Sequence, residues 1–160
     1  MIDLFEQLAR LAETSSAGNF MRASRYGYAA VSATHIIGII LLLGPTILLD
    51  LKLLGLWPRA DRMSILIAVM PVAATGFVIV LASGFLLFSA QATDYVKLPI
   101  FQIKMGILIL GILSALILHL KYGIKFERAP FGKRIYFSAL SICLWISGVF
   151  AGRLIAFSAV

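Results

Sequence analysis

The chain has 160 residues, of which 61% are hydrophobic and only 13% are charged, and its formal net charge is +7. A soluble globular domain carries about a quarter of its residues as charged side chains, so this composition predicts a membrane protein. The positive charge does not require a nucleic-acid partner, and we expect none. Much of it lies in loops beside apolar segments, where it can meet the anionic lipid of a bilayer.

The first residues predict an amphipathic helix rather than a secretory signal. Charged residues interrupt the opening stretch too often for an apolar signal core to form. They are Asp3, Glu6, Arg10 and Glu13. Leucine and phenylalanine fall on one side of the expected helix, with polar residues largely opposite, which is typical of a helix that lies in the membrane interface. We therefore expect an interfacial segment over residues 1–19, with a turn at 14–19 that leads into the first span.

Four long segments without charged residues stand out in the chain. A spanning helix needs roughly 20 mainly apolar residues. The first two segments reach that length as they stand, and the other two reach it when flanking residues are included. We predict transmembrane helices over about 26–50, 63–89, 100–121 and 134–157. The expected fold class is an all-α integral membrane protein, a four-transmembrane-helix bundle that forms a single domain over residues 1–160.

Small residues recur at helical spacing in these segments, which allows helix backbones to approach closely in lipid. In the fourth segment, Gly148 and Gly152 have GxxxG spacing. This pattern predicts packing within the chain or between chains, so a homo-oligomer stays open. Pro45 and Pro71 are expected to kink the first and second helices.

The basic residues of the loops predict an orientation. The loops over 50–62 and 121–134 together hold more than half of the 14 Lys and Arg residues. An excess of positive charge favours the cytoplasmic side. We therefore expect a multi-pass protein of the bacterial inner membrane with both termini in the periplasm.

The two histidines of the chain, His35 and His119, both lie inside uncharged apolar segments. Ionisable residues at such depth are rare and usually face a bundle interior or a functional cavity. Each histidine is therefore a candidate metal ligand. At a rise of about 1.5 Å per residue, the two rings are roughly 17 Å apart along the membrane normal. This separation disfavours one haem iron bound by both histidines and favours two sites, one near each membrane face.

The outer site is predicted around His35. Lys104 and Met105 on the third helix and Arg153 on the fourth helix are expected at the same depth. The two cations suit haem propionates or a quinone oxygen, and Met105 is a candidate axial ligand. The alternative for Lys104 and Arg153 is that they reach toward lipid headgroups from positions near the helix ends.

The inner site is predicted around His119. Asp50, at the end of the first helix, is expected to orient the imidazole of His119. Met70, on the second helix, offers a thioether to a metal at this depth. The alternative is that His119 is a polar residue tolerated near the membrane interface.

Several motifs follow one another along residues 32–122. They are His35-Ile-Ile-Gly, Leu49-Asp-Leu-Lys-Leu-Leu-Gly-Leu, Ser83-Gly-Phe-Leu-Leu-Phe, Tyr95, Phe101-Gln-Ile-Lys and His119. This order resembles a family of small bacterial four-helix membrane proteins of uncharacterised function. More distantly, a first-helix histidine followed by a third-helix lysine is similar to haem-containing protoporphyrinogen oxidases and copper-resistance D proteins.

The distant resemblance implies b-type haem or copper-linked redox chemistry, with His35 as the ligand and Lys104 as its companion. The chain departs from the pattern at two positions. Ser83 stands where threonine is commoner, and Ser114 stands where asparagine is commoner.

Three functions fit these residues. The first is a b-type haem protein that transfers electrons in the membrane, in one version to or from quinone, with His35 as an axial ligand. The second is a metal-handling protein with His35 and Met105 at one face and His119 and Met70 at the other. The third is a non-catalytic membrane subunit or anchor that binds a protein partner. We favour the first. No Gly-rich phosphate loop, CxxC or HExxH motif occurs in the chain. Whether the chain is an enzyme therefore stays open.

Overall fold

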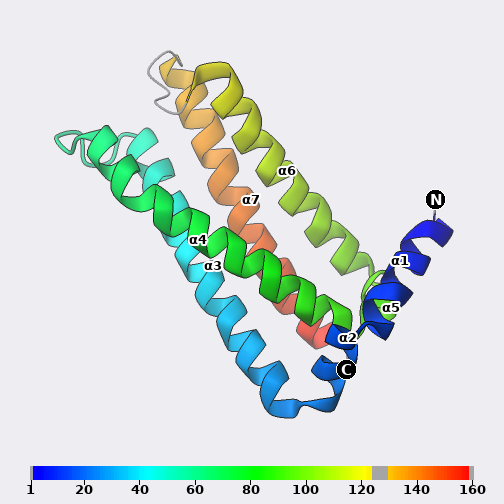
Figure 1. The fold of residues 1–160 in the computed structure, drawn as a ribbon. Coiled ribbons are helices and arrows are strands. Elements are labelled where there is room, and N and C mark those ends of the chain that lie inside the picture. Colours follow the sequence, from blue (N-terminus) through cyan, green and yellow to red (C-terminus); the bar gives the residue numbers. More distant parts are fainter. Residues whose placement is uncertain (1, 124–129, 159–160) are drawn as a thin grey trace. The chain divides into compact units, whose positions relative to one another are not determined.

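The computed structural model describes residues 2–123 and 130–158, apart from the side chains of Ile2, Asp3, His119, Ala156 and Ser158. These residues form seven α-helices and no strand. Four of the helices are long and apolar enough to cross a membrane. They are α3 (Arg25–Leu53), α4 (Arg62–Ala90), α6 (Pro99–Tyr122) and α7 (Phe131–Ser158) (Figure 1). Each extends the predicted range by one to three residues at either end, so the prediction of four long apolar helices is confirmed.

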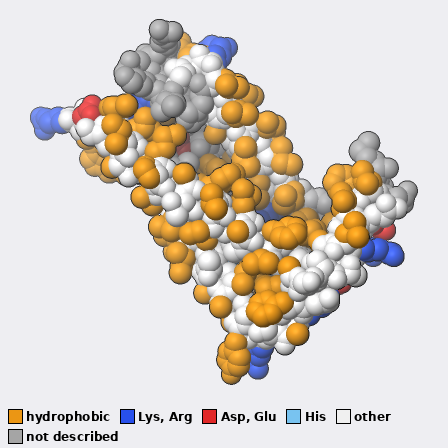
Figure 2. All heavy atoms as spheres, in the orientation of Figure 1, with side chains coloured by type: hydrophobic (Ala, Val, Ile, Leu, Met, Phe, Trp, Pro, Cys, Tyr) orange, Lys and Arg blue, Asp and Glu red, His pale blue; other side chains and the backbone are white. Residues whose placement is uncertain are grey.

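Large apolar side chains are exposed along the four long helices. Figure 2 shows hydrophobic side chains over much of the visible surface. Ile40, Val78 and Leu120 are among the most exposed, at 63%, 64% and 78%. Helices that are hydrophobic all round suit a lipid environment, because there is no water there to penalise this surface. The architecture therefore fits a multi-pass membrane protein.

The chain divides into two compact units. The first comprises Met1–Leu42 with Val72–Gln102, and the second comprises Leu43–Pro71 with Ile103–Val160. The helices α3 and α4 contribute to both units, and α6 contributes its first turn to the first unit. The single domain expected from the sequence stays a prediction.

The helices α3 and α4 both contain a proline and continue through it. Pro45 lies inside α3, and Pro71 lies inside α4. Proline removes one backbone hydrogen bond from a helix. Spanning helices tolerate this loss because neighbouring groups satisfy the freed carbonyl.

Local chemistry separates α3 from α4. Gly55 has a φ of 101°, a left-handed conformation that favours glycine and stops α3 from continuing. Asp61 precedes α4, and its Oδ2 accepts hydrogen bonds from the backbone N–H and the hydroxyl of Ser64 at 2.7 and 2.6 Å. An aspartate in this position satisfies N–H groups that have no partner within the helix.

In the first unit, the backbones of α3 and α4 approach closely at two glycines. A Cβ atom on Gly76 would clash with the backbone of α3 at Leu42, and one on Gly38 would lie 2.7 Å from Cγ2 of Ile79. The backbone of α3 cannot yield as a flexible side chain can. The close approach that the small residues predicted is therefore present at this contact.

Two short helices, α1 (Ile2–Thr14) and α2 (Ser16–Ala23), precede α3. The turn predicted over 14–19 is wrong, because only Ser15 separates the two helices. The Ser15 Oγ accepts the N–H of Gly18 at 3.2 Å, so this serine is the N-cap of α2. The prediction of a helix at the start of the chain is confirmed, but it is followed by a second helix.

The helix α1 packs against the short helix α5 (Ala92–Tyr95) within the first unit (Figure 1). Ala9 of α1 is buried, with only 2% of its surface exposed. The apolar side chains of α1 remain 53–67% exposed. They are Leu4, Phe5, Leu8 and Leu11. This apolar face is therefore available to a lipid surface or a partner.

In the second unit, the two GxxxG glycines of α7 lie beside side chains of α6. A Cβ atom on Gly148 would lie 3.5 Å from Cδ2 of Leu108, and one on Gly152 would lie 3.3 Å from Nζ of Lys104. Both glycines therefore make room for α6 within the chain.

Candidate functional site

His35 lies on α3 in the first unit, half-buried beside α4. Its Nδ1 lies 2.9 Å from Oγ of Ser83. The Ser83 hydroxyl donates its single proton to the backbone carbonyl of Ile79, one turn earlier on α4. The Oγ of Ser83 is thus left to accept a hydrogen bond from His35, which requires that Nδ1 carry a proton. The neutral imidazole then has its lone pair on Nε2.

The residue after Ser83 leaves space for the histidine ring. A Cβ atom on Gly84 would lie 3.2 Å from Cε1 of His35, closer than ordinary contact. Ser83 itself is only 4% exposed, so its hydrogen bond to the ring is shielded. The Ser83-Gly84 pair therefore both orients the ring and allows it to lie against α4. A histidine held through Nδ1–H in this way is typical of one whose Nε2 binds a metal.

The predicted companions of His35 all belong to the second unit. The side chain of Lys104 extends over Gly152 of α7. Arg153 is exposed, and its guanidinium carbon lies 5.0 Å from the ring centre of Phe157. This placement of Arg153 agrees with the alternative that it reaches toward lipid headgroups.

Met105 is 40% exposed on α6. Its part as an axial ligand, and the parts of Lys104 and Arg153 beside a cofactor, stay predictions.

The predicted inner site is described only in part. His119 lies in α6, but its side chain is outside the described residues, so its role as a metal ligand stays a prediction. Asp50, expected to orient it, is 8% exposed and accepts a hydrogen bond from the Ser141 hydroxyl of α7. The Oδ2 atom of Asp50 is buried without a hydrogen-bond partner among the described residues. Met70 is 39% exposed.

Among the described side chains, no group of three or more His, Cys, Asp or Glu residues gathers as a set of metal ligands. A haem needs fewer protein ligands than a bare metal ion does, because the porphyrin supplies four. His35 as one axial ligand of a haem stays a prediction.

Tyr95, on α5 in the first unit, belongs to a cluster of stacked aromatic rings with Phe88 and Phe101. Its ring centre lies 6.5 Å from that of Phe88 and 5.9 Å from that of Phe101. Burial raises the pKa of the Tyr95 hydroxyl, and the Tyr28 hydroxyl close by raises it further. These contacts give Tyr95 a packing role in the first unit.

Sequence reasoning did not foresee the partner of His35 or the partner of Asp50. The sequence motifs include Ser83 but assign it no partner, and they do not include Ser141. In both cases, the only sequence signal for the partner was a serine within an otherwise apolar helix. Comparison of the chain with protein families, curated proteins and solved structures finds no match.

Proposed function

We propose that this chain is a b-type haem-binding electron-transfer protein of the membrane, with Nε2 of His35 as an axial ligand. The observation that supports this most is the Ser83–His35 hydrogen bond at 2.9 Å. It puts the ring proton on Nδ1 and the lone pair on Nε2, the arrangement that an axial histidine needs. The same hydrogen bond makes the imidazole a stronger donor to iron.

When bound, haem supplies one-electron chemistry at its iron, with a potential set by the axial ligands and by burial. In this proposal the chain contributes the ligand and its orientation by Ser83. Quinone is the proposed electron partner. The parts of Lys104, Arg153 and Met105 in this proposal rest on the sequence, as do an inner-membrane location and periplasmic termini.

The test is an absorption spectrum of the detergent-purified protein, oxidised and reduced, after expression with ample haem supply. We expect a Soret band that is lost in His35→Ala. Thr34→Ala is the matched control, because Thr34 is the adjacent, exposed residue whose hydroxyl donates to Ala30 of the same helix at 2.9 Å. A colourless preparation, or a band that survives in His35→Ala, would contradict the proposal.

A second function, that of a non-catalytic membrane subunit or anchor, is favoured by the exposed apolar face of α1. Leu8 and Leu11 on this face are 53% and 67% exposed, although α1 itself is fastened to α5. Such a face can bind an apolar partner surface. Co-purification of a stoichiometric partner that is lost in Leu8→Ser/Leu11→Ser and unaffected by His35→Ala would support this function over the first.

A further inference from the structure

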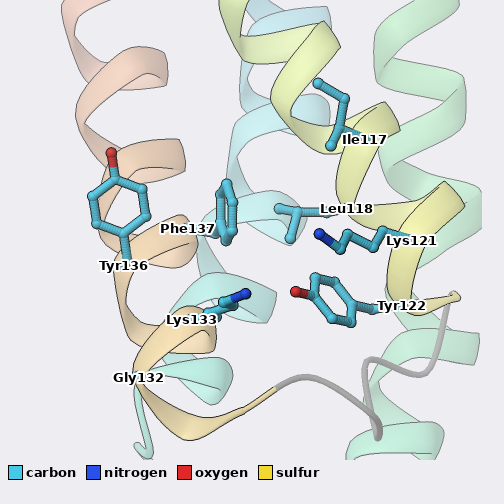
Figure 3. Close-up of a pocket in the computed structure, with 8 residues that line it drawn as sticks. All are labelled: Ile117, Leu118, Lys121, Tyr122, Gly132, Lys133, Tyr136 and Phe137. Carbon is cyan, nitrogen blue, oxygen red and sulfur yellow. The ribbon is translucent and has the colours of Figure 1, made fainter.

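A cavity of about 330 Å³ lies in the second unit between the end of α6 and the start of α7. Lys121 and Tyr122 line it from α6, and Lys133 lines it from α7. Figure 3 shows both ammonium groups and the Tyr122 hydroxyl pointing into the space between the two helices. Three hydrogen-bond donors from two helices therefore converge there.

Among the described residues, the charged side chains that line this cavity are all positive. No Asp or Glu is present among the described residues that line it. Two ammonium groups directed into one cavity repel each other unless an anion lies between them. The cavity therefore suits an anion.

The start of α7 adds further donors. Gly132 lines the cavity, and among the described residues the first backbone hydrogen bond of α7 is that of the Arg134 N–H to Pro130 O at 3.1 Å. The backbone N–H groups before Arg134 thus have no acceptor within the helix. Such N–H groups, together with the positive end of the helix dipole, bind phosphate readily.

The rest of the cavity wall is apolar. Leu118 is 9% exposed and Ile117 is 55% exposed, and Figure 3 shows Phe137 on α7 facing Leu118. These residues lie about one turn from the two lysines, toward the apolar part of each helix. A ligand with an anionic head and an apolar tail matches this order of surfaces.

We propose that this cavity binds the phosphate of an anionic phospholipid. Lys121, Lys133 and the first-turn N–H groups of α7 contact the phosphate oxygens, the Tyr122 hydroxyl donates to them, and an acyl chain runs along Ile117. Both helices are long and apolar enough to span a membrane, and basic pockets at the ends of spanning helices bind anionic headgroups. This site is separate from the proposed haem ligand and does not depend on it.

Native mass spectrometry of the full chain, released from nanodiscs of mixed phosphatidylglycerol and phosphatidylcholine, tests the site. We expect wild type to retain phosphatidylglycerol in preference to phosphatidylcholine. Each lysine near a membrane surface strengthens anionic lipid binding by roughly fivefold, so Lys121→Gln/Lys133→Gln should weaken it by about thirtyfold. Lys121→Arg/Lys133→Arg should retain binding, and circular dichroism should show the same helix content in all variants.

Lys52→Gln/Lys97→Gln is the control, because it removes the same charge from lysines outside the cavity. Equal loss in this control, or no loss in Lys121→Gln/Lys133→Gln, would overturn the proposal. Equal retention of phosphatidylcholine would overturn the preference for an anionic lipid. Displacement of phosphatidylglycerol by millimolar inorganic phosphate would assign the cavity to free phosphate instead of lipid.

Discussion

One carboxylate oxygen of Glu13 accepts both the backbone N–H and the hydroxyl of Thr93, at 2.8 and 2.6 Å. The two residues are 80 positions apart, on α1 and at the start of α5. Arg22 reinforces this link, because its guanidinium donates to the backbone carbonyls of Glu13 and Ala90 at 2.7 and 3.2 Å. Polar contacts therefore hold α1 against α5 within the first unit. The apolar face of α1 takes no part in these contacts.

The docking of α1 should depend on pH. The two hydrogen bonds from Thr93, and to a lesser extent Arg22 and Lys97, hold the pKa of Glu13 below its ordinary value of 4.5. A lowered folded-state pKa stabilises docking fully above pH 4.5, and this stabilisation is lost as the pH falls through the lowered value. We expect the backbone amides of α1 to exchange hydrogen for deuterium faster at strongly acidic pH, after the measured rates are corrected for the intrinsic pH dependence of exchange. In Glu13→Gln, exchange should already be faster at neutral pH and should not change with acid; a wild-type acid response in this variant would contradict the assignment to Glu13.

Replacing Gly76 should destabilise the contact of α3 with α4. A Cβ atom there meets the backbone of α3, so Gly76→Ala is expected to cost about 1–3 kcal/mol of unfolding free energy in detergent. Gly106→Ala is the matched control, because a Cβ at that position meets no described atom within 4 Å apart from the adjoining backbone of its own helix. Alanine is also the better helix former, so the control should be neutral or slightly more stable. Equal stability of the two variants would show that the helices can separate at Gly76 without cost.

Ser83 should support haem binding through His35. Loss of a partner that orients a ligating histidine typically weakens binding about 10- to 100-fold, and we expect this range for Ser83→Ala in a haem titration followed at the Soret band. Ser83→Thr keeps the hydroxyl and should bind as wild type. Ser89→Ala is the control, because Ser89 is also buried on α4 and donates only a bond to Leu86 of its own helix at 2.7 Å. If both alanine variants bind haem equally well, Ser83 does not act through His35.

Removing the partner of Asp50 should be worse than removing Asp50 itself. In Ser141→Ala, the buried carboxylate loses its hydroxyl donor, which should cost about 1.5–3 kcal/mol of unfolding free energy. Asp50→Leu keeps a similar volume without a charge, so it is expected to be nearly neutral or stabilising. Ser147→Ala, at an exposed serine of the same helix, is the control. A larger loss in Asp50→Leu than in Ser141→Ala would reverse this ranking and indicate that the carboxylate has a further partner.

The long helices were predictable because their apolar character follows directly from the composition and length of each segment. The start of the chain was harder. Residues 14–19 contain the serine, glycine and asparagine typical of turns, yet Ser15 caps a helix that runs to Ala23. The same residue types serve both purposes, and only neighbouring contacts decide between them. The periodicity of α1 likewise indicated its apolar side but not that Glu13 would fasten it to Thr93.

At the candidate site, the sequence indicated His35 because an imidazole is costly in an apolar segment. It did not indicate the partner, since Ser83 lies 48 residues away on another helix. Serine is common on apolar helices, where its hydroxyl usually bonds the preceding turn, as that of Ser83 also does. The Ser83 hydroxyl also accepts a hydrogen bond from the ring of His35, because α3 and α4 bring the two residues together. The sequence alone does not give this alignment.

The commitment of the Ser83 proton to Ile79 also limits what His35 can do. A Grotthuss-type relay needs each hydroxyl to pass on one proton as it receives another, but a peptide carbonyl is far too weak a base to take the serine proton away. Protons therefore do not pass from His35 through the Ser83 hydroxyl. The hydrogen bond between Nδ1 of His35 and Ser83 therefore orients the ring and does not carry protons away from it.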